Sequence, residues 1–188
     1  MFVRTKRLTL RPGWIEDAPE LARAIGQECV VRNLSRVPWP YTLGDAETFL
    51  ADRQRDSDGA FFLIWEHDGG NVRLIGGMGL ARDDREAESH ELGYWLVPSA
   101  WGRGYATEAG LGVVRLARES LRLKRLVARH CLDNPASGRV LRKLGFRLMG
   151  QATIHSLARR AEVPCATLEL PLAEEDGCGA DPHARMAA

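Results

Sequence analysis

The chain has 188 residues, of which 45% are hydrophobic and 27% charged, as expected for one soluble globular domain with a sizeable core. Its 26 basic and 25 acidic residues nearly cancel, so the net charge indicates no nucleic-acid or membrane partner. The four cysteines lack the close paired spacing of a zinc or redox motif, the N-terminus lacks the apolar core of a signal peptide, and no apolar run approaches the roughly 18 residues of a membrane span. We therefore expect a cytoplasmic protein with reduced cysteines and no metal.

The N-terminal part of the chain predicts a strand followed by two helices. "RLTLRP" (7–12) alternates apolar and polar residues like a short strand, and "DAPELARAI" (17–25) predicts a helix with Asp17 as N-cap and Glu20 as its capping-box partner. The prolines of "VPWPYT" (37–42) interrupt regular structure, and "GDAETFLADRQRD" (44–56) resumes a helical pattern.

The remaining segments predict a sheet interrupted by two helices. Three antiparallel strands are expected in "AFFLIWEHD" (60–68), "VRLIGGMGLARDD" (72–84) and "SHELGYWLV" (89–97). They are followed by a helix over 105–121, a strand over 125–132, a helix over 135–144 that stops at Gly145, and a closing hairpin over 146–154 and 163–170. Residues 173–188 carry little apolar material and are predicted to be disordered.

The helix over 105–121 follows a loop of small residues that is suited to an anion. Since this helix connects strands 89–97 and 125–132, the two strands should be parallel and the helix should begin at their carboxyl edge. The first turn of a helix offers unpaired N–H groups and a partial positive charge. Gly102, Gly104 and Ala106 would let a phosphate approach those groups closely, although the glycines also suit a tight turn.

Four motifs carry a family resemblance. "LTLRP", "VPWPYT", "HELGYWLVPSAWGRGYATEA" and "DNPASGRVLRKLGF" occur in the order typical of the GCN5-related N-acetyltransferases (GNAT), and the sequence resembles the subgroup that acetylates ribosomal-protein N-termini. The resemblance implies a mixed α/β fold, with a twisted, mostly antiparallel sheet, one parallel strand pair splayed around a pantetheine arm, and helices on both faces. It also implies a single acetyltransferase domain over residues 1–172.

The same resemblance implies acetyl-CoA as the acetyl donor. The family's phosphate loop, Q/R-x-x-G-x-G/A, matches Trp101, Gly104 and Ala106, with tryptophan as a departure at the first position. The implied pyrophosphate ligands are the backbone amides of Gly102, Arg103, Gly104, Tyr105, Ala106 and Thr107, with the Arg103 side chain either on a phosphate or solvated. Asn134 matches the residue that usually bonds pantetheine, although a helix N-cap is an equal alternative, and Ser137 matches a residue often near the thioester sulfur.

Acetyl transfer to an amine sets further demands on the site. Only the neutral amine attacks a thioester, and at pH 7 its deprotonation costs about 1.1 kcal/mol for an α-amine and about 4.6 kcal/mol for lysine. Glu91 in the central strand is the candidate base, with a structural glutamate as the alternative. A bulge near Leu96 and Val97 would expose amides that polarise the thioester carbonyl, and Ser137 would assist the leaving thiolate. The loop residues Trp39 and Tyr41 either form a wall of the acceptor pocket or cover the core.

The sequence therefore predicts an N-acetyltransferase that joins acetyl-CoA and a primary amine in a ternary complex, with a protein N-terminal amine as the expected acceptor. Three alternatives stay open: a small amine such as a polyamine or antibiotic, a CoA-binding sensor without turnover, and an RNA- or ribosome-binding protein that uses its many arginines. We expect no direct nucleic-acid contact and no membrane contact, and the sequence leaves a homodimer open.

Overall fold

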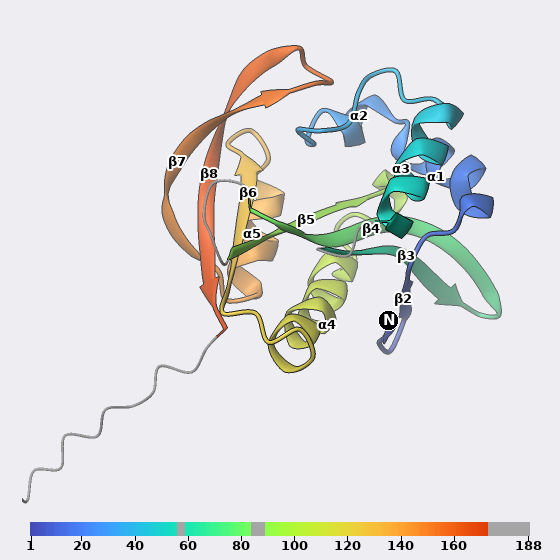
Figure 1. Ribbon diagram of the computed structural model, residues 1–188, viewed down its shortest axis with the longest axis horizontal. Coiled ribbons are helices and arrows are strands. Elements are labelled where there is room, and N and C mark those ends of the chain that lie inside the picture. The colour runs from blue at the N-terminus through green and yellow to red at the C-terminus, as the bar shows by residue number, and fades with distance from the viewer. Residues whose placement is uncertain (56–58, 84–88, 173–188) are drawn as a thin grey trace, which may run out of the picture.

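A computed structural model of the protein describes residues 1–55, 59–83 and 89–172. An eight-stranded sheet forms its centre, in the order β1-β2-β3-β4-β5-β6-β8-β7 (Figure 1). The strands are β1 (Val3–Arg4), β2 (Leu8–Arg11), β3 (Ala60–Asp68), β4 (Asn71–Arg82), β5 (Ser89–Leu96), β6 (Arg125–Cys131), β7 (Arg147–Ser156) and β8 (Ala161–Pro171).

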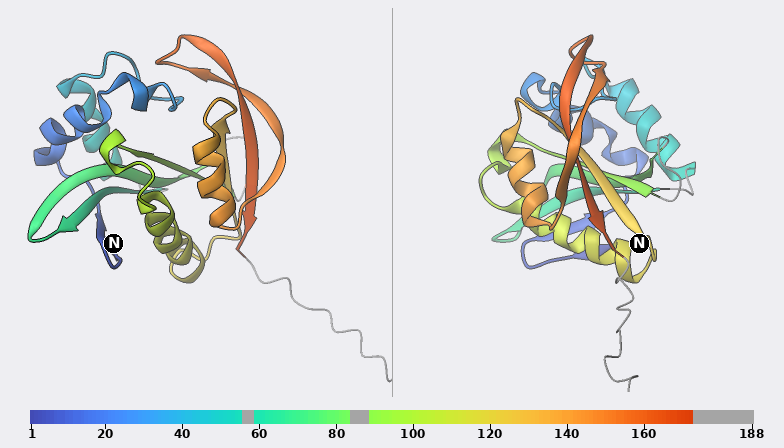
Figure 2. Two further views of the ribbon diagram at one scale, coloured as in Figure 1. Left: turned by 180° about the vertical axis from the view of Figure 1, so that it is seen from behind. Right: turned by 90° about the vertical axis from the view of Figure 1, so that its left-hand side faces the viewer.

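Helices cover both faces of this sheet. The helices α1 (Ala18–Ile25), α2 (Glu28–Val31) and α3 (Leu43–Arg55) lie on one face, and α4 (Tyr105–Glu119) and α5 (Pro135–Lys143) lie on the other (Figures 1 and 2). The apolar core lies between these layers, and its largest fully buried side chains include Phe62, Ile75 and Met78. Within the described ranges, no helix is both long enough and apolar enough to cross a membrane.

One strand pair in the sheet is parallel. Every other neighbouring pair is antiparallel, whereas β5 and β6 run in the same direction and are joined by the crossover helix α4. Their pairing ends at Glu91 and Val127, although β5 continues to Leu96 and β6 to Cys131. The two strands therefore separate toward their carboxyl ends (Figure 1). This arrangement confirms the predicted mixed α/β fold with one splayed parallel pair.

The sequence missed two short elements and misjudged one cap. Neither the two-residue strand β1 nor the four-residue helix α2 was predicted, because so few residues show no periodicity. The predicted capping box of Asp17 and Glu20 is wrong. Asp17 instead accepts hydrogen bonds from Arg11 and from the Trp14 N–H, and Glu20 accepts one from the Leu74 N–H. The predicted disordered tail, 173–188, lies outside the described residues.

Candidate functional site

The splayed strands open into the large cavity of the molecule. Its volume is about 840 Å³, and its walls come from α2 and the residues after it, from β5 and β6, and from the starts of α4 and α5. All of these segments converge at the carboxyl ends of the parallel strands, where the sequence placed the anion-binding loop.

The start of α4 presents backbone N–H groups without acceptors. The loop turns into the helix through Gly102, with φ 73°, and through the N-cap Gly104, with φ 81°. A side chain is strained at these angles, so glycine is needed for the loop to keep this path. In the part of the chain that the structure describes, the N–H groups of residues 102–107 donate to no protein acceptor, and the first helical bond is donated by Glu108 to Gly104. A Cβ atom on Gly102 would meet no heavy atom within 4 Å. This bare helix start fits an anionic phosphate group.

The buried carboxylate of Glu66, in β3, contacts this loop and the first residue of α4. Glu66, which is 2% exposed, accepts a hydrogen bond from Tyr105 Oη and lies 2.6 Å from Arg73 and 3.3 Å from Arg103. Burial by itself raises the pKa of Glu66, but the hydrogen bonds from Tyr105 and Arg73 and the charges of Arg73 and Arg103 outweigh it and lower that pKa. The ionised carboxylate thus ties both the loop and the first residue of α4 to β3.

A second carboxylate ties the start of the chain to the same helix turn. Glu108 accepts hydrogen bonds from Thr5 Oγ1 at 2.6 Å, from the Arg7 N–H at 3.0 Å and from Arg7 Nε at 2.7 Å. Burial raises the pKa of Glu108, and these bonds together with the charge of Arg7 more than compensate, so the pKa lies below its usual value. Arg7 also stacks over the Tyr105 ring and donates to the Arg103 carbonyl.

The alternation along β5 separates two sides of the cavity. Because cross-strand neighbours share a face, Glu91, Gly93 and Trp95 project toward the α1–α3 side, where Phe61, opposite Gly79, packs on Phe49 of α3. Tyr94 lies on the opposite, α5 side, where its hydroxyl contacts Ser137. After the roles that the sequence predicts for Glu91 and Ser137, we call these the acceptor face and the donor face.

The donor face carries the predicted pantetheine and sulfur contacts. Asn134 is the N-cap of α5, and its Oδ1 accepts a hydrogen bond from the Ser137 N–H at 3.2 Å. The cap and the predicted ligand role are compatible, because this bond does not use the Asn134 amide N–H₂ group. Ser137 Oγ lies 2.7 Å from Tyr94 Oη, so the two hydroxyls join β5 to α5 across the cavity wall.

The predicted bulge near Leu96 and Val97 is wrong. The β4–β5 register is uninterrupted from Gly76 opposite Leu96 to Arg82 opposite His90, and the Val97 N–H donates to the Ile75 carbonyl at 2.9 Å. Val97 therefore offers no free amide. Since hydrogen-bonded residues alternate along a strand, the amides of Tyr94 and Leu96 face the gap beside β6.

The Leu96 carbonyl on that side accepts a hydrogen bond from the Trp101 indole at 2.8 Å. Trp101, the residue that departs from the family pattern, thus anchors the glycine-containing loop before α4 to β5.

On the acceptor face, Glu91 lies beside an unfilled part of the cavity. Glu91 Oε1 lies 3.2 Å from Arg129 Nη1, and its Oε2 lies 3.8 Å from Arg36. Arg129 also binds Asp83 at 3.0 Å, so two carboxylates share one guanidinium. A Cβ atom on Gly93 would meet nothing within 4 Å, so the cavity is open next to the Glu91 carboxylate.

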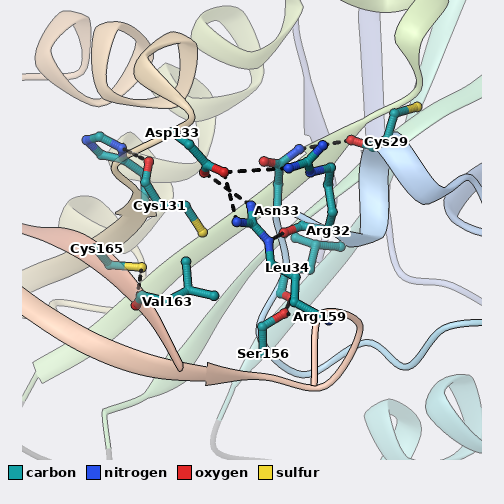
Figure 3. Close-up of polar contacts among 11 residues, drawn as sticks. Cys29, Arg32, Asn33, Leu34, Cys131, Asp133, Ser156, Arg159, Val163 and Cys165 are labelled. Carbon is teal, nitrogen blue, oxygen red and sulfur yellow. Dashed lines mark hydrogen bonds and ion pairs between the residues drawn. The ribbon is translucent and has the colours of Figure 1, made fainter. Parts of the chain in front are cut away.

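One end of the cavity is bounded by a polar clasp, formed by Arg159, Asp133 and the backbone of residues 32–35 (Figure 3). Arg159, in the turn between β7 and β8, donates to the Arg32 carbonyl at 2.6 Å and to both Asp133 oxygens at 2.8 and 3.1 Å. The same hairpin donates from the Leu157 N–H to the Ser35 carbonyl. The clasp joins the segment after α2 to the C-terminal hairpin.

Most of the predicted site residues come together at this cavity. Its walls include Glu91, Leu96, Gly102, Gly104, Tyr105, Ala106, Thr107, Asn134 and Ser137. Four predicted residues are not among the wall residues: Val97, Arg103, Trp39 and Tyr41. Arg103 pairs with Glu66, and Trp39 and Tyr41 pack against the core, so their predicted roles stay predictions.

Sequence analysis missed Tyr94, Arg129 and the two carboxylates that support the loop. Tyr94 had a usable signal, because it alternates with Glu91 in a predicted strand and must project from the other face. No local sequence signal indicates Glu66 or Glu108, since their partners are distant in sequence. Among the described residues, no group of three His, Cys, Asp or Glu side chains is arranged to hold a metal ion.

Comparisons with known proteins agree with this geometry. The family described as "Acetyltransferase (GNAT) domain" matches residues 7–147. An N-acetyltransferase of Bacillus subtilis, YoaA, is 40% identical over 157 residues, covering 79% of this chain and 84% of its own. The ribosomal-protein-serine acetyltransferase of Escherichia coli is 33% identical over 89 residues, covering 47% of this chain and 48% of its own.

A solved structure shares the fold at low identity. The spermidine N-acetyltransferase of Vibrio cholerae, in complex with CoA and spermine, superposes with a TM-score of 0.76 at 15% identity, covering 89% of this chain and 97% of that chain. Because the family match extends over most of the chain and a relative of similar length is 40% identical, the protein belongs to the GNAT family and is an N-acetyltransferase.

Proposed function

We propose that the protein transfers the acetyl group of acetyl-CoA to the N-terminal amine of a protein, by direct attack in a ternary complex. The bare N–H groups of residues 102–107 support the donor, because they offer a diphosphate several hydrogen-bond donors at the positive end of a helix. The similar V. cholerae enzyme was solved with CoA, which agrees with this choice.

The opposite faces of β5 support direct attack. Ser137, which is predicted near the thioester, lies on the donor face together with its contact Tyr94, and Glu91 lies on the acceptor face. The gap between β5 and β6 connects the two faces, so an amine beside Gly93 can reach a thioester held from the other side. Glu91 would accept the proton that the amine loses, directly or through water.

The charges around Glu91 are the observation that supports this choice of acceptor. Arg129 and Arg36 both lie beside its carboxylate, and Arg32, which lies 3.7 Å from Asp133, also lines the cavity. A polyamine carries further cations that these guanidiniums would repel, whereas a protein N-terminus brings a single amine. With a pKa of about 7.8, an α-amine also needs the least deprotonation at pH 7. The similarity to the E. coli ribosomal-protein-serine acetyltransferase points to the same class of acceptor.

The test is an acceptor panel in one assay of thiol release from acetyl-CoA. The panel holds peptides with free N-termini, the same peptides with a blocked N-terminus and one internal lysine, and spermidine. We expect turnover with the free N-termini, and mass spectrometry should place the acetyl group on the α-amine. Preference for spermidine would contradict the proposed acceptor.

Two further outcomes would favour a protein without turnover. Tight CoA binding with no thiol release on any acceptor indicates a CoA sensor. Salt-sensitive RNA binding that CoA does not affect indicates a ribosome- or RNA-associated role.

The free thiols of Cys29, Cys131 and Cys165 are compatible with the reducing cytoplasm that we propose as the compartment.

A further inference from the structure

We infer that Tyr94 is a positioning residue for the departing thiol, through Ser137. In this inference the Tyr94 hydroxyl donates to Ser137 Oγ, and the single Ser137 proton is thereby available to the sulfur that leaves the acetyl group. The inference rests on the proposed function, in which Ser137 assists that sulfur, and it adds a residue that the family pattern did not indicate.

The geometry places the two hydroxyls as a pair. Tyr94 Oη lies 2.7 Å from Ser137 Oγ, where either hydroxyl can be the donor, and its single proton can also be donated to the Ser137 carbonyl oxygen at 3.2 Å, which leaves Ser137 as donor to Tyr94. Tyr94 comes from β5 and Ser137 from the first turn of α5, and both line the cavity on the donor face. Asn134 already holds the Ser137 N–H, so the serine backbone is fixed and only its hydroxyl can rotate.

Because each hydroxyl of the pair has only one proton, the direction of the bond between Tyr94 and Ser137 decides where the Ser137 proton goes. A serine hydroxyl has one proton and two acceptor sites, and a tyrosine hydroxyl likewise has one proton. If Ser137 donates to Tyr94, its only proton is used within the protein. If Tyr94 donates to Ser137, the serine proton points into the cavity. A sulfur that gains negative charge favours the second arrangement, since hydrogen bonds to charged acceptors are the stronger ones.

Tyr94 is well suited to remain the donor. Burial raises the pKa of Tyr94 to about 12, and the hydrogen bond with Ser137 offsets this only in part. The hydroxyl therefore keeps its proton throughout the neutral range. Without it, the Ser137 hydroxyl is free to donate to a backbone carbonyl of the preceding turn, as serines in helices do, and its proton turns away from the gap.

The bonds of the transfer step balance without a net proton change at this pair. The C–N bond forms as the C–S bond breaks, the electron pair of the C–S bond goes to sulfur, and the neutral amine loses one proton while the thiol finally gains one. Tyr94 and Ser137 act as two hydrogen bonds in series on the sulfur, and each regains its original state when the thiol leaves.

A double-mutant cycle tests the inference with Tyr94→Phe, Ser137→Ala and the double variant. Each single change should lower kcat by about tenfold, the loss expected when one productive hydrogen bond disappears, with the acetyl-CoA KM within about twofold. In the Ser137→Ala background, Tyr94→Phe should cost less than about twofold, because the residue through which it acts is gone. Thr9→Val is the matched control, since it removes a 2.7 Å hydroxyl bond to His67 far from the cavity and should leave kcat unchanged.

Slow acetyl-CoA hydrolysis in the absence of any amine provides a readout that needs no identified acceptor. The inference is wrong if Tyr94→Phe keeps the wild-type kcat, or if it lowers kcat equally with and without Ser137. A purely structural tyrosine would lower the melting temperature and raise KM, with additive effects in the cycle. Failure of the acceptor assignment looks different: peptide turnover is then absent while the hydrolysis rates still follow the cycle.

Discussion

Glu91 is the residue whose neighbours define its chemistry. Its carboxylate is held at 3.2 Å by Arg129, and Asp83 shares that guanidinium from the other side. Arg129 is 10% exposed and lines the cavity together with Glu91, so a largely buried guanidinium holds the Glu91 carboxylate at the cavity wall. If Glu91 is the base that we propose, this fixed position beside the open space at Gly93 reduces the rearrangement needed when an amine arrives.

Glu91→Gln should lower turnover far more than CoA affinity. We expect kcat to fall about tenfold with a peptide α-amine and about 100-fold with a lysine acceptor, since the amine with the higher pKa depends more on the base. Steady-state kinetics with both acceptors and a CoA titration provide the measurement. Glu169→Gln is the matched control, because Glu169 is also a strand glutamate that faces an arginine, at 3.8 Å from Arg125. An unchanged rate would remove Glu91 from the mechanism.

At the scale of elements, β5 is the strand whose two faces we propose to bind the two substrates. Its odd-numbered residues from Glu91 to Trp95 face the helices α1–α3, and Tyr94 faces α5. The pleat of a single strand thereby separates acceptor from donor. The claim can be tested at Gly93, where a side chain would fill empty space on the acceptor face alone.

Gly93→Val should raise the acceptor KM about tenfold while the CoA affinity stays within about twofold, because the new side chain occupies only the acceptor side. The strand should tolerate valine, a residue with high β propensity. Gly150→Val is the matched control, since Gly150 is a glycine of β7 that also has no atom within 4 Å of its ideal Cβ position. Equal losses of acceptor and CoA binding would show that the two faces are not separate.

The start of α4 is the second element on which the proposed function depends, and it is held by the buried carboxylate of Glu66 and the partly buried carboxylate of Glu108. Both Glu66 and Glu108 have a pKa below the ordinary value, because their hydrogen bonds and arginine partners outweigh the effect of burial. A carboxyl group whose pKa is lower in the folded state stabilises the fold above its unfolded pKa of about 4.3. That stabilisation is lost as the pH falls through the folded value.

Glu66→Gln should therefore destabilise the protein at pH 7 and make its free energy of unfolding depend less on pH in acid. We expect a loss of about 2 kcal/mol at pH 7, typical of a hydrogen bond to a charged group. The free energy of unfolding should then fall less steeply than in the wild type as the pH drops below about 4.3. Urea denaturation from pH 7 to pH 3 provides the measurement. Glu119→Gln, at an exposed glutamate of α4, should leave the wild-type slope intact; a parallel slope for Glu66→Gln would argue against this support.

At the scale of the whole molecule, the gap between β5 and β6 is the passage through the sheet. In the proposed ternary complex, donor and acceptor occupy the two faces together, and transfer needs no covalent enzyme intermediate. The clasp of Arg159 and Asp133 closes one end of this passage by joining the segment after α2 to the last hairpin.

Initial rates should therefore depend on both substrates in the pattern of a sequential mechanism. Double-reciprocal plots at several acceptor concentrations should intersect, since both substrates must be bound before either product leaves. Parallel lines, or an acetylated protein isolated after incubation with acetyl-CoA alone, would contradict direct transfer.

Much of this arrangement could be predicted from the sequence, and most of the misses share one cause. The meander, the crossover helix and the glycines of the loop are local patterns, which periodicity and turn residues reveal. The bulge at Leu96 and Val97 was misplaced because strand register depends on the neighbouring strand. Here Ile75 receives the Val97 N–H, and Gly76 packs so tightly that a Cβ would lie 2.3 Å from the Trp95 carbonyl oxygen.

Dependence on partners that are distant in the sequence also explains why Glu66 and Glu108 were missed. Glu66 finds Tyr105 39 residues away, and Glu108 finds Arg7 101 residues away, so neither pairing leaves a local signal. Asp17 was expected to cap its own helix, yet the Arg11 guanidinium offers its carboxylate two hydrogen bonds at 2.7 Å. This miss has a different cause, because Arg11 is only six residues away: a charged hydrogen-bond partner nearby prevails over the expected cap.

The most direct measurement is a calorimetric titration of CoA into Gly104→Val. At φ 81° a β-branched residue is strained, and its side chain would stand beside the bare N–H groups that we assign to the diphosphate. The account predicts a loss of CoA affinity of about 100-fold or more, or about 2.7 kcal/mol. Gly70→Val carries a similar strain at φ 95° in the turn between β3 and β4 and should bind CoA like the wild type. A folded Gly104→Val protein with wild-type CoA affinity would contradict the account.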